Sequence, residues 1–225
     1  MPKRALIDRR PILLASMAVA LAYYVMRQSP VVPELWLIPL KGAGVGLLAL
    51  YAFVRHAGTD ARMLGAMFVL AALGDMGIEI DRMAGAILFF GYHLVAISLY
   101  LRHPRERPTP SQKAAAVVML VLTPAILWLL PADRSEAWPV ALYGLALGGM
   151  AASAWLSAFP RYRVGVGAVL FLVSDLLIVA ESGPLMGEPL VQWLIWPLYY
   201  IGQFLICLGV AQTLHKRHAD VITHV

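Results

Sequence analysis

Charged residues are scarce in this sequence. Lys, Arg, Asp and Glu together make up 14% of the 225 residues, whereas 60% are hydrophobic and the mean hydropathy is +0.74. A soluble globular domain carries about 25% charged residues and about 45–50% apolar ones. The composition therefore excludes an ordinary soluble domain and indicates an integral membrane protein.

Cysteine and the usual catalytic signatures are also missing. The one cysteine is Cys207, so no disulfide forms within the chain. There is no Gly-x-Ser-x-Gly nucleophile elbow, no glycine-rich phosphate loop and no cysteine-nucleophile pattern. Of the six histidines only His93 falls inside an apolar run, whereas a catalytic zinc site commonly uses three protein ligands. We therefore expect neither a metal nor a cofactor.

Long apolar runs, by contrast, fill the chain. A spanning helix needs roughly 20 mostly apolar residues. We predict spans at residues 11–26, 34–54, 62–80, 83–101, 114–130, 139–158, 164–182 and 190–214. The predicted fold class is all-α: a polytopic membrane protein with eight transmembrane helices, forming one helical bundle domain over residues 1–225. We see no cleavable signal peptide, so we expect the first run to stay as a span.

Lysine and arginine are distributed unevenly between the loops. Alternate loops, starting with the N-terminal segment, hold 14 of the 18 Lys and Arg, and the other loops hold only Arg27, Arg82 and Arg134. Basic residues mark the cytoplasmic side of a membrane protein. We therefore predict that both termini are cytoplasmic, in the inner membrane of a bacterium. The net charge of +5 follows from this topology and does not indicate a nucleic-acid partner.

Two aspartates lie within apolar runs. Asp75 is in the third predicted span and Asp175 in the seventh, and each follows a small residue, Gly74 or Ser174. An ionised Asp at the bilayer centre costs roughly 2.5–3.5 kcal/mol on insertion scales. We therefore expect the two aspartates to share one polar site, whose interactions offset this cost. The third and seventh spans run in the same direction, which fits a weak repeat of four plus four helices.

Other polar side chains share the depth of the aspartates, between mid-membrane and the outer face, when counted at 1.5 Å per residue. They are Lys41, Glu79, His93, Tyr199, Tyr200 and Gln203. We expect these residues to bind substrate or to tune the acidity of the aspartates. The simpler alternatives are that Lys41 snorkels to the interface, that His93 and the tyrosines only pack, and that Glu79 is solvated.

A pair of carboxyl groups in unlike surroundings can hold different pKa values, so that one donates a proton while the other is ionised. This pairing suits hydrolysis of an acid-labile bond through a cationic intermediate. The alternatives are a proton-coupled transporter, because buried carboxylates also relay protons, and a non-enzymatic lipid-binding membrane protein. Few helices are broken by Gly or Pro at matched positions of the two halves, which disfavours a transporter.

Four short motifs resemble the YhhN-like family, which includes the animal lysoplasmalogenases. They are Leu73-Gly74-Asp75, Gly85-Ala86-x-Leu88-Phe89-x-x-Tyr92-His93, Gly167-Ala168-x-x-Phe171-x-x-Ser174-Asp175 and Tyr199-Tyr200-Ile201-x-Gln203-x-Leu205-Ile206. The resemblance covers nearly the whole chain, including the layout of eight spans. The chain departs from the family at Lys41-Gly42, where the family has Lys-Pro.

The resemblance implies a hydrolase that cleaves the vinyl ether bond of a lysoplasmalogen to a fatty aldehyde and glycerophosphoethanolamine or glycerophosphocholine. It implies a lysophospholipid substrate and membrane lipids as partners. It also implies that Asp75 and Asp175 are the catalytic pair. One of them protonates the vinyl ether carbon, the other stabilises the resulting oxocarbenium ion and activates water, and either aspartate can take either role.

Overall fold

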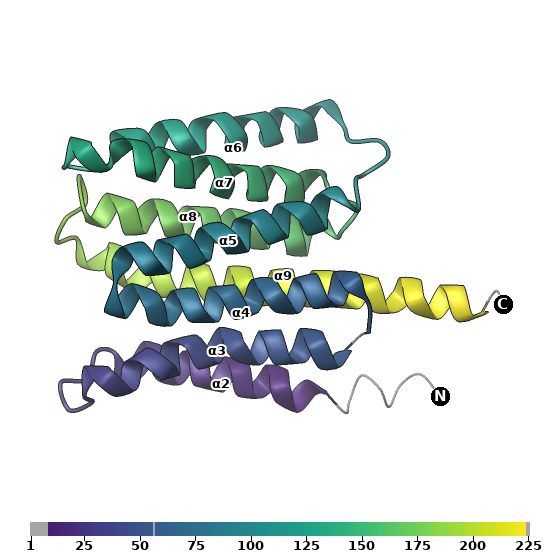
Figure 1. Cartoon of the computed structure of the whole chain (residues 1–225), viewed down its shortest axis with the longest axis horizontal. Coiled ribbons are helices and arrows are strands. Elements are labelled where there is room, and N and C mark those ends of the chain that lie inside the picture. The colour runs from purple at the N-terminus through teal and green to yellow at the C-terminus, as the bar shows by residue number, and fades with distance from the viewer. Residues whose placement is uncertain (1–8, 56, 224–225) are drawn as a thin grey trace. The chain divides into compact units, whose positions relative to one another are not determined.

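The computed structural model describes residues 9–55 and 57–223, with side chains described as far as Lys216. Figure 1 shows its helices: α2 (Arg10–Met26), α3 (Glu34–Arg55), α4 (Thr59–Ile80), α5 (Arg82–Leu101), α6 (Pro110–Leu129), α7 (Ala137–Leu156), α8 (Val166–Glu181) and α9 (Pro189–Thr223). A short 3-10 helix, η1 (Arg134–Glu136), precedes α7, and a π-helical turn, η2 (Arg161–Gly165), leads into α8. No strand occurs among the described residues, so the all-α prediction is confirmed.

The eight predicted spans match α2 to α9 to within a few residues at most of their ends. In the described part of the chain, seven helices are long and apolar enough to cross a membrane, and α2, with 17 residues, is the shorter one. The predicted polytopic membrane fold is therefore confirmed. Four residues that the topology prediction places on the cytoplasmic side lie outside the described residues: Lys3, Arg4, His56 and His224.

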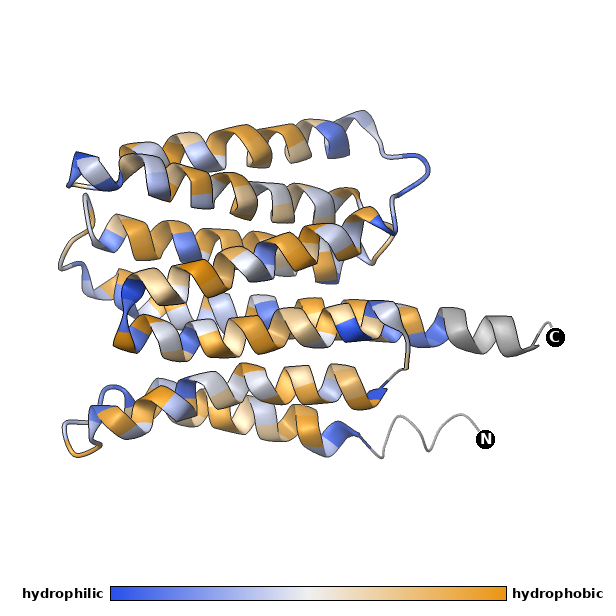
Figure 2. Cartoon of the chain, in the orientation of Figure 1, coloured by the Kyte–Doolittle hydropathy of each residue, from blue (hydrophilic) through white to orange (hydrophobic). Residues whose placement is uncertain are grey.

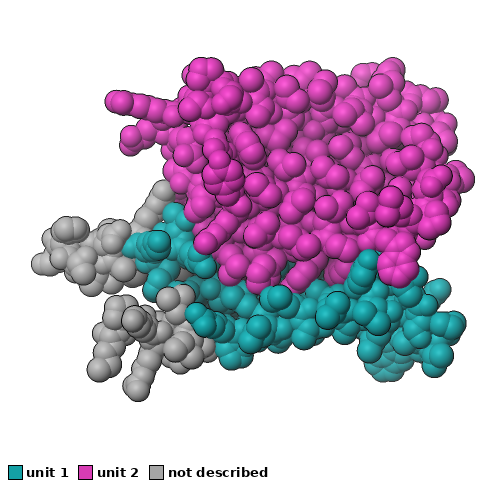
Figure 3. Space-filling view, turned by 180° about the vertical axis from the view of Figure 1, so that it is seen from behind, with its two compact units in different colours: residues 1–95, 211–225 teal, residues 96–210 magenta. Residues whose placement is uncertain are grey.

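The chain forms two compact units, which Figure 3 colours separately. Unit 1 comprises residues 1–95 and 211–225, and unit 2 comprises residues 96–210. Unit 1 therefore holds α2, α3, α4 and most of α5, whereas unit 2 holds α6, α7, α8 and most of α9. The single bundle domain over residues 1–225 stays a prediction.

Within unit 1, neighbouring helices approach each other at glycines. A Cβ atom on Gly42 of α3 would stand 2.8 Å from the carbonyl oxygen of Ala72 on α4, and one on Gly85 of α5 would stand 2.5 Å from the amide nitrogen of Ile78 on α4. Helices in lipid pack through such close contacts between small residues because no hydrophobic effect drives them together. These glycines therefore bring α3 and α5 close to α4.

The helices of unit 2 show the same kind of contact. A Cβ on Gly167 of α8 would stand 2.6 Å from the carbonyl oxygen of Gly202 on α9, and the reverse distance is also 2.6 Å. A Cβ on Gly148 of α7 would stand 2.6 Å from the carbonyl oxygen of Met119 on α6. Neither α8 with α9 nor α7 with α6 would pack this closely if a side chain stood between them.

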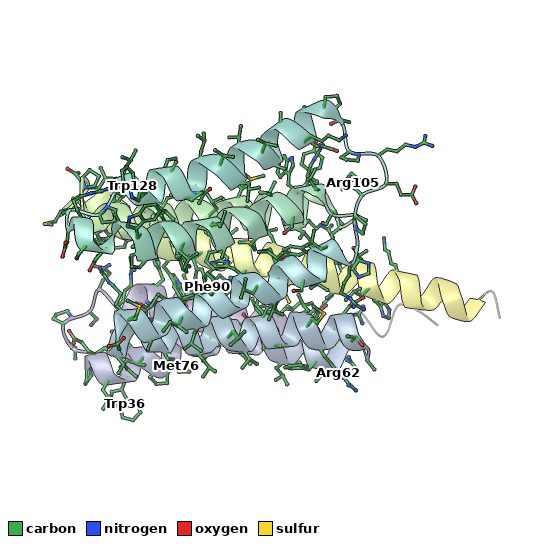
Figure 4. All side chains as sticks on the ribbon, turned by 45° about the horizontal axis from the view of Figure 1, so that its top comes forward. Trp36, Arg62, Met76, Phe90, Arg105 and Trp128 are labelled. Carbon is green, nitrogen blue, oxygen red and sulfur yellow. The ribbon has the colours of Figure 1, made fainter. Side chains whose placement is uncertain are left out.

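The surfaces of both units suit a membrane. Figure 2 shows apolar residues along the lengths of the helices and hydrophilic residues mainly at their ends and in the loops. In Figure 4, Trp36 and Arg62 lie at opposite ends of the helices of unit 1, and Trp128 and Arg105 lie at opposite ends of those of unit 2. Tryptophan at membrane interfaces and arginine on the cytoplasmic side are typical of membrane proteins.

Candidate functional site

The first predicted catalytic residue, Asp75, is buried on α4, five residues before that helix ends, and its residue surface is 2% exposed. Gly74, directly before it, faces the ring of Phe89 on α5, and a Cβ on this glycine would stand 2.9 Å from that ring. The small residue noted before the aspartate thus has a packing reason, because it lets α5 approach α4 next to the carboxyl group.

Lys41 of α3 extends toward the same part of α4. Its Nζ lies 2.6 Å from Oε1 of Glu79, which is one helical turn after Asp75 and so on the same helix face. The Lys41 ammonium also interacts electrostatically with Asp75. Its side chain is 14% exposed, compared with 40% for Glu79. The structure therefore brings these three predicted site residues together. The simpler alternative had Glu79 solvated; its side chain is partly exposed, but it is also paired with Lys41.

A fourth residue of this cluster was not expected from the sequence. The Lys41 ammonium lies 5.9 Å from the ring centre of Tyr23 on α2, within the range of a cation–π contact. Tyr23 is buried, with 6% of its surface exposed. Its place in a predicted span opposite Lys41 is a weak signal, because most aromatic residues in spans only pack.

His93 is fully buried on α5. Gly77 of α4 lies opposite Gly85 of α5, and Gly91 contacts Leu70, so the two helices run antiparallel in this register. The register places His93 level with residues 69–70 of α4, roughly 8 Å along the helix axis from Asp75 at 1.5 Å per residue. The histidine is therefore one to two turns from the aspartate rather than beside it.

The second predicted catalytic residue, Asp175, lies on α8 in unit 2 with 6% of its surface exposed. The hydroxyl of Tyr143 on α7 donates a hydrogen bond of 2.5 Å to its Oδ2. Tyr143 was not expected from the sequence. The available signal was a tyrosine at the depth of Asp175 in the preceding span, because a buried tyrosine hydroxyl usually finds a hydrogen-bond partner.

Ser174, directly before this aspartate, connects α8 to α9. Its Oγ donates a hydrogen bond of 3.1 Å to the carbonyl oxygen of Ile195. A cross-helix bond of this kind fixes the rotation of one helix against its neighbour. Ser174 thereby sets the direction in which the next residue, Asp175, leaves the helix.

The predicted site residues of α9 divide into two groups. Tyr199 is buried, and its ring meets the edge of Phe171 at a centroid distance of 5.2 Å. Phe171 is one turn before Asp175 on α8, so Tyr199 packs on the face that carries this aspartate. Gln203, one turn after Tyr199, is also buried. Tyr200 stacks instead on Trp196 of its own helix, at 6.2 Å.

The two units share a local plan. In each, the aspartate is on the third helix, the residue before it packs on the fourth helix, and a polar side chain of the second helix interacts with the aspartate. That side chain is Lys41 for Asp75 and Tyr143 for Asp175. The likeness agrees with the expected repeat of four plus four helices. The unlike partners give the two carboxyl groups unlike surroundings.

The chemistry of these clusters is that of proton transfer and charge stabilisation. Carboxyl, ammonium and phenol groups donate and accept protons and stabilise opposite charge. Among the residues that the structure describes, no three His, Cys, Asp or Glu side chains are grouped to hold a metal ion.

Comparison with known proteins identifies the family. The profile of the YhhN family matches residues 35–210. Two curated relatives, each named lysoplasmalogenase, come from Mycobacterium bovis and Mycobacterium tuberculosis. Each is 30% identical over 178 residues, which is 75% of this chain and 68% of the relative. No solved structure shows significant similarity to this chain. The match spans α3 to α9 and includes both aspartates, and the chain therefore belongs to the YhhN family.

Proposed function

We propose that this protein is a membrane hydrolase that cleaves the vinyl ether bond of lysoplasmalogens. The observation that carries the proposal is the burial of two carboxyl groups, Asp75 and Asp175, in helices apolar enough to cross a membrane. Such groups are functional by default because their burial is costly. Membership of the YhhN family and the lysoplasmalogenase names of two relatives support this choice of substrate.

The proposed reaction needs one proton donor and one base. A carboxylic acid protonates the β-carbon of the vinyl ether, which leaves an oxocarbenium ion. A carboxylate stabilises this cation and takes a proton from the water that attacks it. The resulting hemiacetal breaks down to a fatty aldehyde and the free hydroxyl of a glycerophosphoethanolamine or glycerophosphocholine. Asp75 and Asp175 supply the two groups, in either order.

The residues around each aspartate take supporting roles in this proposal. Lys41, paired with Glu79, sets the charge around Asp75. Tyr199 packs on Phe171, one turn before Asp175 on α8, and Gln203 is a buried amide one turn farther along α9. His93 is one to two turns from Asp75, and Tyr200 stacks on Trp196 of its own helix, so we assign them a smaller influence on the rate. The protein acts in the inner membrane with both termini in the cytoplasm, as the charge distribution indicates.

The experiment measures aldehyde release from a lysoplasmenyl-ethanolamine by the purified protein in detergent. Asp75→Asn and Asp175→Asn should each lower kcat by about 100- to 10,000-fold, the usual contribution of a general acid or base. Asp133→Asn is the matched control, because it makes the same chemical change at an exposed loop residue, and it should keep full activity. Full activity in either of the first two variants would remove the proposal.

The double variant tests whether both carboxyl groups serve one reaction. Residues that act as a unit are strongly non-additive. The Asp75→Asn/Asp175→Asn protein should therefore be little slower than the slower single variant.

Mass spectrometry of a lipid panel incubated with the wild-type and doubly substituted proteins then identifies the head group and chain that are preferred.

A further inference from the structure

We propose that Tyr143 is a positioning residue, which holds the carboxyl group of Asp175 in the orientation that the reaction requires. This inference rests on the proposed function, in which Asp175 is a catalytic residue. It goes beyond that function because Tyr143 belongs to none of the motifs on which the family resemblance is based. Its basis is the hydrogen bond from the Tyr143 hydroxyl to Oδ2 of Asp175.

The bond itself is short. At 2.5 Å between the two oxygen atoms, it lies at the lower limit of hydroxyl–oxygen hydrogen bonds, whose commonest length is about 2.7–2.8 Å. A hydrogen bond that a hydroxyl donates to an ionised carboxylate is stronger than one between neutral groups. Because the bond is part-buried, it holds the carboxyl group more firmly than it would at a fully exposed surface.

The backbone of Asp175 is fixed before its side chain is considered. Gly167 and Gly202 bring α8 and α9 into backbone contact, and Ser174 binds the carbonyl oxygen of Ile195. These contacts set the distance and the rotation of α8 relative to α9. The orientation of the Asp175 side chain then depends on its two torsion angles, which the bond from Tyr143 to Oδ2 restrains.

Tyr143 is held in place by its own helix pair. The next residue, Gly144, is in close contact with α6, since a Cβ there would stand 3.0 Å from Cα of Pro124. One turn later, Gly148 meets the carbonyl oxygen of Met119 on α6. The phenol is therefore carried by a tightly packed α6–α7 pair, and a fixed donor can orient the acceptor that it binds.

The position of the carboxyl group affects the rate of reaction more than it affects the binding of substrate. Proton transfer requires the carboxyl oxygen within hydrogen-bond reach of the reacting atom, and a misplacement of about 1 Å can cost about 100-fold in rate. Tyr143→Phe should therefore lower kcat by about 10- to 100-fold and leave KM within about twofold. It keeps every carbon atom of the side chain, so the packing of α7 is unchanged.

Tyr100→Phe is the matched control. Tyr100 is a fully buried tyrosine of unit 2 whose hydroxyl has no hydrogen-bond partner among the described residues. Its substitution removes the same atom from a tyrosine that is more deeply buried than Tyr143, and it leaves Asp175 untouched. The kcat and KM of this control should match those of the wild type.

Infrared difference spectroscopy supplies a readout that a purely structural role would not change. The carboxyl bands of Asp175 are those lost in Asp175→Asn. They should shift in Tyr143→Phe and stay in place in Tyr100→Phe. Incorporation of 3-fluorotyrosine at residue 143 keeps the hydroxyl and nearly the same volume, so it should retain kcat to within about threefold of the wild type.

The outcomes separate this inference from the proposed function. Should Asp175→Asn be inactive while Tyr143→Phe keeps the wild-type kcat, or should the Asp175 bands stay unshifted in Tyr143→Phe, the positioning role is wrong and the proposed function stands. Should Asp175→Asn keep full activity, the proposed function is wrong and the role of Tyr143 in it falls as well.

Discussion

The Lys41 ammonium and the Glu79 carboxylate lie 2.6 Å apart and join α3 to α4 within unit 1. The two partners differ in surroundings, because the Glu79 side chain is 40% exposed and that of Lys41 only 14%. Lys41 also interacts electrostatically with Asp75, one turn earlier on α4. The cation therefore serves two carboxyl groups, and its loss should matter more than the loss of Glu79.

Lys41→Met should lower the free energy of unfolding by about 3 kcal/mol, because it leaves two neighbouring carboxyl groups without their cation. Glu79→Gln removes the more exposed partner and should cost less than about 1 kcal/mol. Unfolding in mixed detergent micelles measures both values, and the release of aldehyde should fall further in Lys41→Met. Equal losses of unfolding free energy in Lys41→Met and Glu79→Gln would contradict the larger role that we assign to Lys41.

Gly42 lies at a close contact between α3 and α4. Gly42→Ala should destabilise the protein by about 1–3 kcal/mol, because its Cβ would stand 2.8 Å from the carbonyl oxygen of Ala72. Gly46→Ala, one turn later, is the control, since its Cβ would meet that of Ala72 at 3.8 Å, an ordinary contact. Thermal unfolding followed by circular dichroism distinguishes the two, and a harmless Gly42→Ala would disprove the close contact.

The cross-helix bond of Ser174 should contribute modestly to stability. Hydrogen bonds between helices in membranes contribute about 0.6 kcal/mol on average and at most about 1.7 kcal/mol. Ser174→Ala should therefore lower the free energy of unfolding by about 0.6–1.7 kcal/mol. Ser153→Ala is the control, because Ser153 binds a carbonyl oxygen of its own helix, that of Met150. If both variants unfold alike, the bond to Ile195 does not hold α8 against α9.

Asp133, in the turn between α6 and α7, should make a small pH-dependent contribution to stability. The backbone N–H of Ser135, 2.9 Å from its Oδ1, holds the pKa of this carboxyl group below its usual range. Because its pKa is lower in the folded state, this carboxyl group stabilises the folded protein at pH values above the ordinary carboxyl pKa of about 4. This stabilisation is lost as the pH falls through the lowered pKa. The melting temperature of Asp133→Ala should therefore be below that of the wild type at pH 7 and approach it below pH of about 4. A difference that persists in acid would contradict this account.

The expected topology can be tested with single cysteines in a Cys207→Ala background. Glu106 and Ala132 are exposed residues in consecutive loops, of which only the first is rich in arginine. A membrane-impermeant maleimide should label Ala132→Cys in intact spheroplasts and Glu106→Cys only after the membrane is opened. The reverse pattern would place both termini outside.

The helices were predictable because a bilayer imposes a narrow range of length on each apolar run. The start of α6 was missed by four residues. Thr109 and Gln112 form a capping box there. The threonine hydroxyl accepts a hydrogen bond from the backbone N–H of Gln112, and the side-chain oxygen of Gln112 accepts one from the backbone N–H of Thr109. The spacing Thr-x-x-Gln carries this signal in the sequence, but it precedes the apolar run that hydropathy detects.

The partners of the aspartates were predictable only in part. Equal depth made Lys41 a candidate neighbour of Asp75, and the interaction is present. Equal depth also favoured His93, which the helix register places more than one turn away. Tyr143 was missed because its depth, the one available signal, does not distinguish a hydroxyl that binds a carboxyl group from an aromatic ring that only packs.

The sequence alone determined the number of helices, their approximate length, and the shared face of Asp75 and Glu79, because these follow from the apolar pattern and the helical repeat. The tertiary structure decided which polar groups of different helices meet. That choice depends on the rotation of each helix about its axis and on how closely glycines such as Gly42 and Gly167 let two backbones approach, and neither quantity is encoded in the order of residues along one helix.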